Sequence, residues 1–475
     1  MTSLRPSRRA LGLGILGGLG AASLGGCAAL PPGLSGPRFA DPLLADLHRR
    51  AFRFFWEVTD HRTGLTPDRW PTRTFSSVAA IGFAFNAYVI GAESGYVRRE
   101  QAAERTFNTL NFLYNLPQGN APSGTAGYKG YFYHFLRYED GTRYKLCELS
   151  SIDTALLLMG ALCAGQYFDR DTPVERDIRR LSTALYERVD WTFMMRPSGR
   201  QTMGWHPEDG FIKAEWEGYY EGMMVYLLAM ASPTHPIDPK AYAVWCSTYD
   251  ETFGLNNGEV HLGFHALFGH QYNHVWIDYR GINDAYMRAK GFDYFENSRR
   301  ATLSQRNYAI ANPMGFKDYG PDIWGFTACD GPADVKLTLD GKERQFRSYS
   351  ARGPGGPHPF DDGTIAPTAA LGSIMFTPKE SLSAAKAMKA RYGSDIYGEY
   401  GFYDSFNPTF VTDYPSKEGH QTPKAGWVAN DYIGIDQGPI LCSIDNLRSG
   451  LLWKLMKGCA PLQRGLKLAG FEAVA

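Results

Sequence analysis

The chain of 475 residues contains 49 Lys and Arg and 49 Asp and Glu, so its formal net charge is zero. This balance argues against a nucleic-acid-binding protein, which needs an excess of basic residues to neutralise phosphates. Hydrophobic residues make up 44% and charged residues 21% of the chain, which excludes wholesale disorder and allows either one large domain or two.

Aromatic residues are frequent, with 28 Tyr, 28 Phe and 10 Trp. Cores are built mostly from aliphatic residues, so an aromatic excess points to a cleft lined by rings, such as those that stack on sugars. The alternative interpretation is that the same rings simply pack in the core.

The N-terminal region has the pattern of an export signal. Arg8 and Arg9 resemble a twin-arginine signal and precede an apolar stretch, residues 11–24, that is too short and too rich in Gly to span a bilayer. Residues 24–27 then resemble a lipobox, in which cleavage before Cys27 leaves a lipidated cysteine. The alternative is a plain cleaved signal with an incidental Cys. We expect an export signal over 1–27, a tether over 28–40 and a single catalytic domain over 41–475.

The six cysteines after Cys27 form neither a CxxC motif nor a dense framework. We expect them to be buried free thiols, with one or two disulfide pairs as the alternative. They are Cys147, Cys163, Cys246, Cys329, Cys442 and Cys459.

Apolar residues at helical spacing dominate the rest of the chain. Strand-like alternation is limited to residues 334–349 and 259–262, and the loop over 117–141 is dense in Gly and Tyr. The predicted helices cover residues 43–58, 76–88, 98–114, 151–168, 174–193, 219–231, 239–253, 283–310, 366–371, 378–392 and 438–456.

This pattern predicts an all-α fold with a minor β-hairpin and long pocket-forming loops. A series of helices with alternately short and long connections is typical of an (α/α)6 toroid. An α-solenoid is the alternative architecture, and the absence of any motif repeated at a fixed period counts against it.

Several motifs that define other enzyme classes are missing from the sequence. There is no GxSxG, no HExxH, no phosphate-binding loop and no GxGxxG after a strand. His261, His265, His270 and His274 recur at steps of four and five residues, but Asp278 is the one nearby carboxylate that could complete a metal site. We therefore expect no metal and no cofactor.

Three segments place carboxylates among apolar or aromatic residues. Glu148 and Asp153 lie at the start of an apolar helix, where an acid either caps the helix or lines a pocket. Glu217 and Glu221 alternate with rings and, four residues apart, share one face of a helix. The third pair, Asp431 and Asp436, lies before the last long helix and could supply a base or a cap.

Two carboxylates facing each other across an aromatic cleft are what glycoside hydrolysis requires. One protonates the departing oxygen, and the other activates water or attacks the sugar.

Seven motifs occur in the order typical of one known family. The sequence resembles the glucoamylase-like domain of glycoside hydrolase family 144 from about residue 45 to residue 458. The motifs are ELSSIDTALLL (148–158), GYYEGMMVYLLAMASPTHP (218–236), LFGHQYNHVWIDYR (267–280), WGFTACDG (324–331), DGTIAPTAA (362–370), GFYDSFNP (401–408) and IDQGPILCSIDNLRSGLLW (435–453).

The resemblance implies an (α/α)6 barrel that hydrolyses β-1,2-glucan with inversion and without a cofactor. Family members act either as endo-enzymes releasing sophorooligosaccharides or as exo-enzymes releasing sophorose. Carried onto this sequence, Glu221 is the candidate acid with Glu217 in reserve, and Asp436 is the candidate base with Asp431 in reserve. Glu148 and Asp153 would bind sugar hydroxyls or act in catalysis themselves. An inverting pair of carboxyls should lie roughly 6.5–9.5 Å apart.

Further residues in or near these motifs would bind the substrate. We expect stacking surfaces from Trp205, Trp216, Tyr219, Trp276, Trp324, Phe402 and Trp427, and hydroxyl ligands in His270, Gln271, Asp278, Arg280 and Asp404. Each of these has core or loop packing as its alternative role.

The sequence thus predicts a monomeric glycosidase in the periplasm of a Gram-negative bacterium, attached to the membrane only by a lipid anchor. Its partner would be a β-glucan chain. Rival hypotheses are an α-glucan glucoamylase or a polysaccharide lyase on a similar toroid, and a glycan-binding lipoprotein without catalysis.

Overall fold

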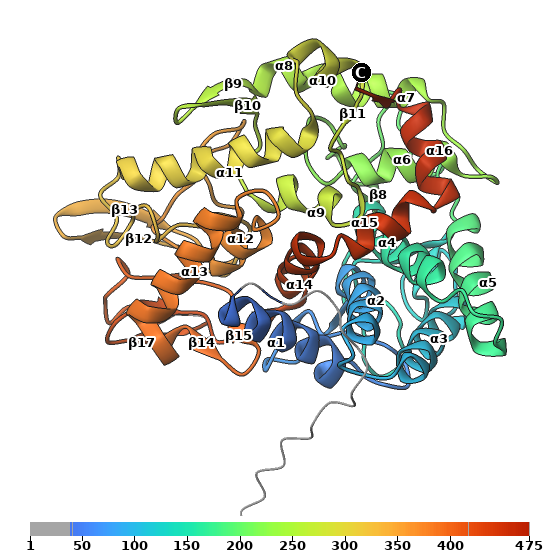
Figure 1. The fold of residues 1–475 in the computed structure, drawn as a ribbon, viewed down its shortest axis with the longest axis horizontal. Helices are drawn as coiled ribbons and strands as arrows, with labels where there is room; N and C mark the ends of the chain where they lie inside the picture. The colour runs from blue at the N-terminus through green and yellow to red at the C-terminus, as the bar shows by residue number, and fades with distance from the viewer. Residues whose placement is uncertain (1–38, 40, 417, 475) are drawn as a thin grey trace, which may run out of the picture. The chain divides into compact units, whose positions relative to one another are not determined.

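The computed structural model describes residues 39, 41–416 and 418–474. The expected export signal, Cys27 and the tether apart from Phe39 lie outside these residues. The described part is mainly helical, with many short strands between the helices (Figure 1). None of the described helices is both long enough and apolar enough to cross a membrane.

Among the described helices, six are buried over nearly their whole surface. Because they carry apolar or small residues all round, no face of them can be left in water. Adjacent members contact each other in the pairs α2 with α4, α4 with α6, α9 with α12, α12 with α14, and α14 with both α2 and α9. They are α2 (Val78–Glu93), α4 (Ser151–Tyr167), α6 (Met223–Ala231), α9 (Phe268–Trp276), α12 (Pro367–Gly372) and α14 (Gly434–Arg448).

The remaining described helices have an exposed face and cover the buried six. Helices α1 and α5 are amphipathic, and both begin with Pro after a capping Asp or Thr. The outer set comprises α1 (Pro42–Val58), α3 (Arg99–Asn115), α5 (Pro173–Glu187), α7 (Lys240–Trp245), α8 (Tyr249–Thr252), α10 (Ala285–Lys290), α11 (Tyr294–Ala311), α13 (Pro378–Tyr392), α15 (Leu451–Lys457) and α16 (Ala460–Leu468).

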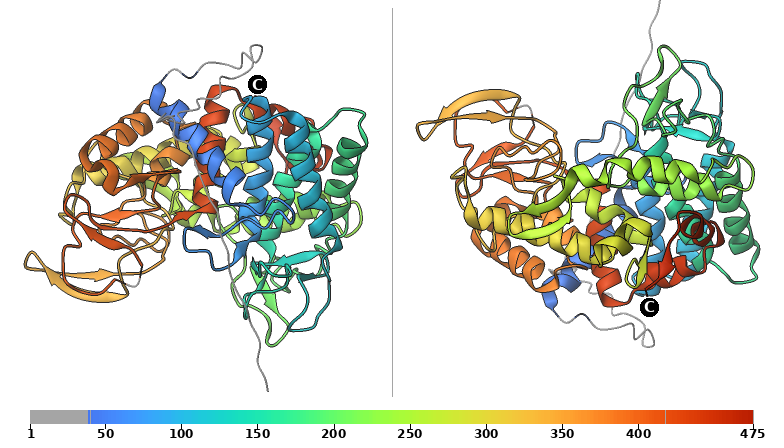
Figure 2. Two further views of the ribbon diagram at one scale, coloured as in Figure 1. Left: turned by 90° about the horizontal axis from the view of Figure 1, so that it is seen from below. Right: turned by 90° about the horizontal axis from the view of Figure 1, so that it is seen from above.

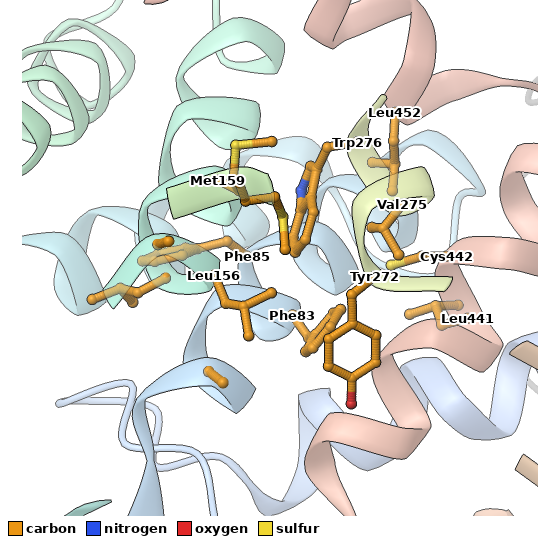
Figure 3. Packing of buried hydrophobic residues seen from close by; sticks show 14 of the residues in the cluster. Phe83, Phe85, Leu156, Met159, Tyr272, Val275, Trp276, Leu441, Cys442 and Leu452 are labelled. Carbon is orange, nitrogen blue, oxygen red and sulfur yellow. The ribbon is translucent and has the colours of Figure 1, made fainter. Parts of the chain in front are cut away.

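Aromatic and aliphatic side chains of the buried helices meet in one large core. Figure 3 shows Phe83 of α2 beside Leu156 of α4 and beside Tyr272 and Trp276 of α9. The rings of Phe83 and Trp276 are stacked with their centroids 5.5 Å apart. Much of the aromatic excess in the composition is therefore core.

The strands form more structure than the predicted hairpin. That hairpin is present as β12 (Val335–Leu339) and β13 (Lys342–Phe346), and residues 259–262 form β10, which pairs with β9 (Phe253–Asn256). A five-stranded antiparallel sheet lies partly in the segment expected to be a loop. Its strands are β3 (Gly127–Tyr128), β4 (Tyr131–Tyr133), β6 (Leu149–Ser150), β7 (Gly204–His206) and β8 (Gly210–Phe211). Strands of two or three residues are too short to show alternation in a sequence.

Of the remaining smaller sheets, three join segments that are distant in sequence and two join neighbouring segments. Figure 2 shows the orange and green strands on the same side of the helices. The pairs are β1 (Arg69–Trp70) with β19 (Tyr432–Ile433), β2 (Ser76–Ser77) with β5 (Phe135–Leu136), β11 (Ile282–Asn283) with β20 (Glu472–Ala473), and β14 (Tyr397–Gly398) with β15 (Gly401–Phe402), together with β18 (Gly426–Val428) between β16 (Phe406–Asn407) and β17 (His420–Thr422).

Two predicted helices are each divided in the structure. The segment 283–310 forms α10 and α11, because Gly291 adopts a left-handed conformation (φ 79°) that ends the first helix. The segment 438–456 forms α14, which begins earlier at Gly434, and α15, with left-handed Gly450 between them. Helices α9 and α16 were missing from the predicted set.

All six cysteines in the described residues are free, as expected. Four are buried as predicted, whereas Cys147 and Cys246 are half-buried.

Candidate active site

Three carboxylates lie where buried helices begin. Asp153 is in the first turn of α4, Asp436 is in the first turn of α14, and Glu221 precedes α6 by two residues. The N-terminal end of a helix favours negative charge, because its first backbone N–H groups have no partner within the helix. The helices thus aim these acids at one region between their N-terminal ends.

Glu221 is held in a protonated state by burial. Glu221 is only 7% exposed, and its Oε2 atom has no hydrogen-bond partner. Burial, reinforced by the negative charge of Asp153, raises the pKa of Glu221 to about 8. The carboxyl therefore carries a proton at neutral pH and is available to donate it.

Asp436 and Asp404 form a buried carboxyl pair. Burial raises the pKa of both carboxyls, to about 6 for Asp404, and the charge of Asp404 raises the pKa of Asp436 further. The backbone N–H of Asp330 donates to Asp404 Oδ2 at 2.7 Å and fixes this partner in place. Asp404 Oδ1 and Asp436 Oδ2 have no hydrogen-bond partner among the described residues.

Arg69 supplies the main positive charge beside this pair. Its guanidinium lies 3.0 Å from Asp330, 2.8 Å from Glu418 and 3.3 Å from Asp68. Burial and the Asp404 charge raise the pKa of Asp330 despite this contact. Asp431, the reserve base, accepts a hydrogen bond from the Thr72 backbone at 2.8 Å and lies 3.9 Å from Arg69, so it helps to hold this segment.

A second charged group lies around His134, between β4 and β5. Its Nδ1 is 2.8 Å from Glu148 Oε1 and its Nε2 is 3.5 Å from Asp153 Oδ1. The side chains of His134 and Glu148 are each about one-third exposed, at 31% and 30%. This edge of the site is therefore open to a ligand from solvent.

Two tyrosines connect the charged groups. Burial and the charges of Asp436, Glu221 and Asp153 raise the pKa of Tyr272 well above its usual value, which places its hydroxyl among the three acids. Tyr272 donates to the Ile435 carbonyl at 2.9 Å. Tyr349 is 46% exposed, yet burial of its hydroxyl and the Asp436 charge raise its pKa as well. Its ring thus reaches from solvent to the acids.

The structure brings together most of the predicted acids and leaves one apart. Glu221, Asp436, Asp153, Glu148 and Asp404 belong to this region, with Asp431 at its edge. Glu217 is separate: its side chain is 47% exposed and forms an ion pair with Arg200 at 2.5 Å.

Most of the rings expected to stack on sugars are buried in the packing. Trp216, Tyr219, Trp276, Trp324, Phe402 and Trp427 are all 0–3% exposed, so none has a face open to a ligand in this structure. Their apolar area fills the interior instead. Trp205 differs, because it is only half buried. It lies in β7 and pairs with Leu149 of β6, the residue after Glu148.

Four of the expected hydroxyl ligands have structural partners. His270 donates to the Phe264 carbonyl, and Gln271 donates to the Ala369 carbonyl and the Ser373 hydroxyl. Asp278 and Arg280 pair at 2.7 Å and line a cavity of about 380 Å³ with residues 446–450 at the C-terminal end of α14.

That cavity lies at the opposite end of α14 from Asp436. Twelve residues along a helix span about 18 Å, at roughly 1.5 Å per residue. The substrate-binding prediction is therefore not supported for Asp278 and Arg280.

The histidine run does not assemble a metal site. Within the described residues, no group of three or more His, Cys, Asp or Glu side chains could hold a metal ion. His274, for example, contacts the Ser298 hydroxyl at 3.0 Å in the core.

Several residues of the site were missed from sequence. Asp68, Arg69 and His134 lie in short strands and loops outside the helical patterns. Asp330 and Tyr272 lie inside two of the quoted motifs, so the motifs could have indicated them as site residues. Tyr349 is the last residue of the predicted hairpin, and no motif indicated a role for it.

The comparisons with known proteins agree on one family. The family model described as "Putative glucoamylase" matches residues 213–460. A crystal structure of a putative glucoamylase from Bacteroides uniformis has a TM-score of 0.77 and 32% identity, covering 92% of this chain and 99% of that one.

Two relatives have a printed activity. An exo β-1,2-glucooligosaccharide sophorohydrolase from Parabacteroides distasonis is 28% identical over 463 residues, covering 90% of this chain. The chain spans 58% of that relative's length. An endo-β-1,2-glucanase from Chitinophaga pinensis, solved with sophorotriose and glucose, has a TM-score of 0.76 and 27% identity, covering 92% of this chain and 99% of that one.

Proposed function

The chain belongs to the family described as putative glucoamylases, and from this membership and its buried acids we propose that it is a glycoside hydrolase that cleaves β-1,2-glucan. The single observation that carries the chemistry is that Glu221 and the Asp436–Asp404 pair are buried, each with a carboxyl oxygen that has no hydrogen-bond partner among the described residues. The substrate class follows from the activities of the Parabacteroides and Chitinophaga relatives.

We also propose that the fold is an (α/α)6 toroid. The six buried helices α2, α4, α6, α9, α12 and α14 would form its inner ring, and the amphipathic helices its outer ring. Their complete burial and their succession of contacts support this arrangement.

In the proposed reaction, Glu221 donates its proton to the glycosidic oxygen as the bond from that oxygen to the anomeric carbon breaks. A water molecule attacks the anomeric carbon from the opposite face, which inverts its configuration. The proton of this water passes to a carboxylate of the Asp436–Asp404 pair. Exchange with solvent returns one proton from the pair and restores Glu221.

Glu148 and Asp153 are proposed to accept hydrogen bonds from sugar hydroxyls beside the bond that breaks. Glu148 lies at the open edge of the site, and Trp205 next to it is the predicted ring that retains exposed surface.

The first test is to incubate the full chain with linear β-1,2-glucan and, separately, with starch, and to follow the products over time. Mixed sophorooligosaccharides would support endo action, and sophorose alone would support exo action. Release of the α-anomer, read by NMR within the first turnovers, would support inversion of a β-linkage. Glucose from starch without attack on β-1,2-glucan would favour the glucoamylase alternative, and inactivity on both would favour a binding protein.

For localisation, we propose export by a twin-arginine-like signal and anchoring to the envelope through Cys27. The support is the order of Arg8, Arg9, the apolar stretch and the lipobox-like residues 24–27.

A further inference from the structure

His134 faces a carboxylate with each of its two ring nitrogens. Glu148 Oε1 lies 2.8 Å from Nδ1, and Asp153 Oδ1 lies 3.5 Å from Nε2. A neutral imidazole carries one N–H and one lone pair, so it would turn its lone pair toward one of the two acids. The doubly protonated imidazolium is the form that directs an N–H at both.

The backbone and the ring of His134 are both held in place. Its N–H donates to the Glu148 carbonyl at 2.9 Å, and its carbonyl accepts from the Val78 N–H at 3.2 Å. The imidazole stacks on Phe135 with centroids 3.8 Å apart and an interplanar angle of 19°. The ring therefore keeps its direction whether or not a ligand is bound.

The charges around this ring are mostly negative. Besides Glu148 and Asp153, the carboxyl of Asp68 acts on the ring. Asp68 pairs with Arg69 at 3.3 Å, and His206 acts on Glu148. Burial opposes the imidazolium, but the adjacent carboxylates outweigh it and raise the pKa of His134 to about 9. Burial alone would raise the pKa of Glu148. The hydrogen bond and the charge of His134 outweigh burial and lower this pKa to about 2.

We propose that His134 is a positioning residue, a fixed cation that turns Glu148 and Asp153 to accept hydrogen bonds from glucosyl hydroxyls beside the bond that breaks. This inference rests on the proposed hydrolysis of β-1,2-glucan. Its physical basis is that hydrogen bonds to a charged acceptor are stronger than those to a neutral one.

The cation also separates the proton states of neighbouring acids. Asp153 contributes to the raised pKa of Glu221. Burial raises the pKa of Asp153 itself, and the positive charge of His134 opposes this rise. Without the imidazolium, Asp153 would take up a proton more readily. It would then donate rather than accept at the sugar.

The state of His134 can be measured without reference to activity. In the intact protein labelled with 15N-histidine, we expect both ring nitrogens of His134 to remain protonated up to at least pH 8, with the resonances assigned by their loss in His134→Gln. Titration near the ordinary histidine pKa of about 6.5 would overturn the inference.

Its consequence for the substrate can be measured by kinetics on short β-1,2-glucooligosaccharides. We expect His134→Gln to raise KM by about tenfold or more, with a smaller change in kcat, because Glu148 and Asp153 lose the cation that orients them. The acidic limb of kcat/KM should move to higher pH, since the carboxyl pKa values rise when the cation is removed. His235→Gln, in an exposed loop, is the matched control and should leave both unchanged.

The outcomes distinguish the two proposals. If the unaltered chain does not cleave β-1,2-glucan, the proposed function fails, while the NMR titration still decides the state of His134. If the unaltered chain cleaves β-1,2-glucan but His134→Gln has the same KM and the same acidic limb of kcat/KM, the positioning role is wrong. A lowered melting temperature with unchanged kinetics would show a purely structural histidine.

Discussion

At the scale of single residues, two neighbouring glutamates with similar sequence surroundings have different environments. Glu221 is buried without a partner for Oε2, whereas Glu217 is exposed and paired with Arg200. We expect Glu221→Gln to lower kcat on β-1,2-glucan by about a hundredfold or more, since a positioned proton donor contributes on this scale. Glu217→Gln is the matched control and should retain activity. Equal loss in both variants would contradict the assignment of the acid.

Glu221 also predicts a dependence of stability on pH. Its folded pKa of about 8 lies above the unfolded value of about 4.5, so the folded state binds the proton more tightly. Stability should therefore fall as the pH rises between these two values. Because Gln cannot ionise, Glu221→Gln should have a higher melting temperature than the unaltered chain at pH 8, and a much smaller difference at pH 4.5. A difference that does not change with pH would contradict burial of the neutral carboxyl.

The Asp436–Asp404 pair predicts non-additive effects. If the two carboxyls act as one base, Asp436→Asn or Asp404→Asn alone should remove most of the activity. The double variant should then be little worse than the more damaging single variant, as for residues that work as a unit. Kinetics of the three variants on one oligosaccharide measure this, and multiplicative losses would indicate independent roles.

At the scale of secondary-structure elements, the closest contact between buried helices depends on glycine. A Cβ atom on Gly160 of α4 would lie 2.0 Å from the Gly82 carbonyl oxygen of α2, and one on Gly82 would lie 2.4 Å from the Leu156 carbonyl oxygen. We expect Gly160→Ala to destabilise the fold by about 1–3 kcal/mol through overpacking, measured as a lowered melting temperature. Gly254→Ala is the control, because its Cβ would meet open space. Equal melting temperatures would show that the two helices can separate without cost.

The element scale also explains which predictions failed. Helices α10 and α11 were expected as one, since apolar spacing continues across a left-handed glycine that only the folded backbone reveals. The five-stranded sheet was missed because its strands are only two or three residues long, and because β6 joins two hairpins that are distant in sequence.

At the scale of the whole molecule, the acids and the start of the described fold lie near opposite ends of α14. The Phe39 ring packs against His48 at 4.9 Å and lies 5.0 Å from the Arg448 guanidinium, at the C-terminal end of that helix. If Cys27 carries the anchor, Cys27→Ser should move the protein from the membrane fraction to the soluble fraction without changing kcat. Retention in the membrane fraction would contradict the lipidation proposal, and a fall in kcat would show that the anchor influences the site.

The sequence by itself determined the helical class, the family resemblance and the segments that carry Glu221, Asp436, Glu148, Asp153 and Asp404. These properties are local: apolar spacing reports which helix face is buried, and a motif reports residues adjacent in the chain. Only the tertiary structure decided that Glu217 lies apart, that most of the expected stacking rings are core, and that Arg69 and His134 neutralise the acids. Burial and pairing decide these roles, and both depend on contacts made in the folded chain, such as the one between Arg69 and Asp330, which are 261 residues apart.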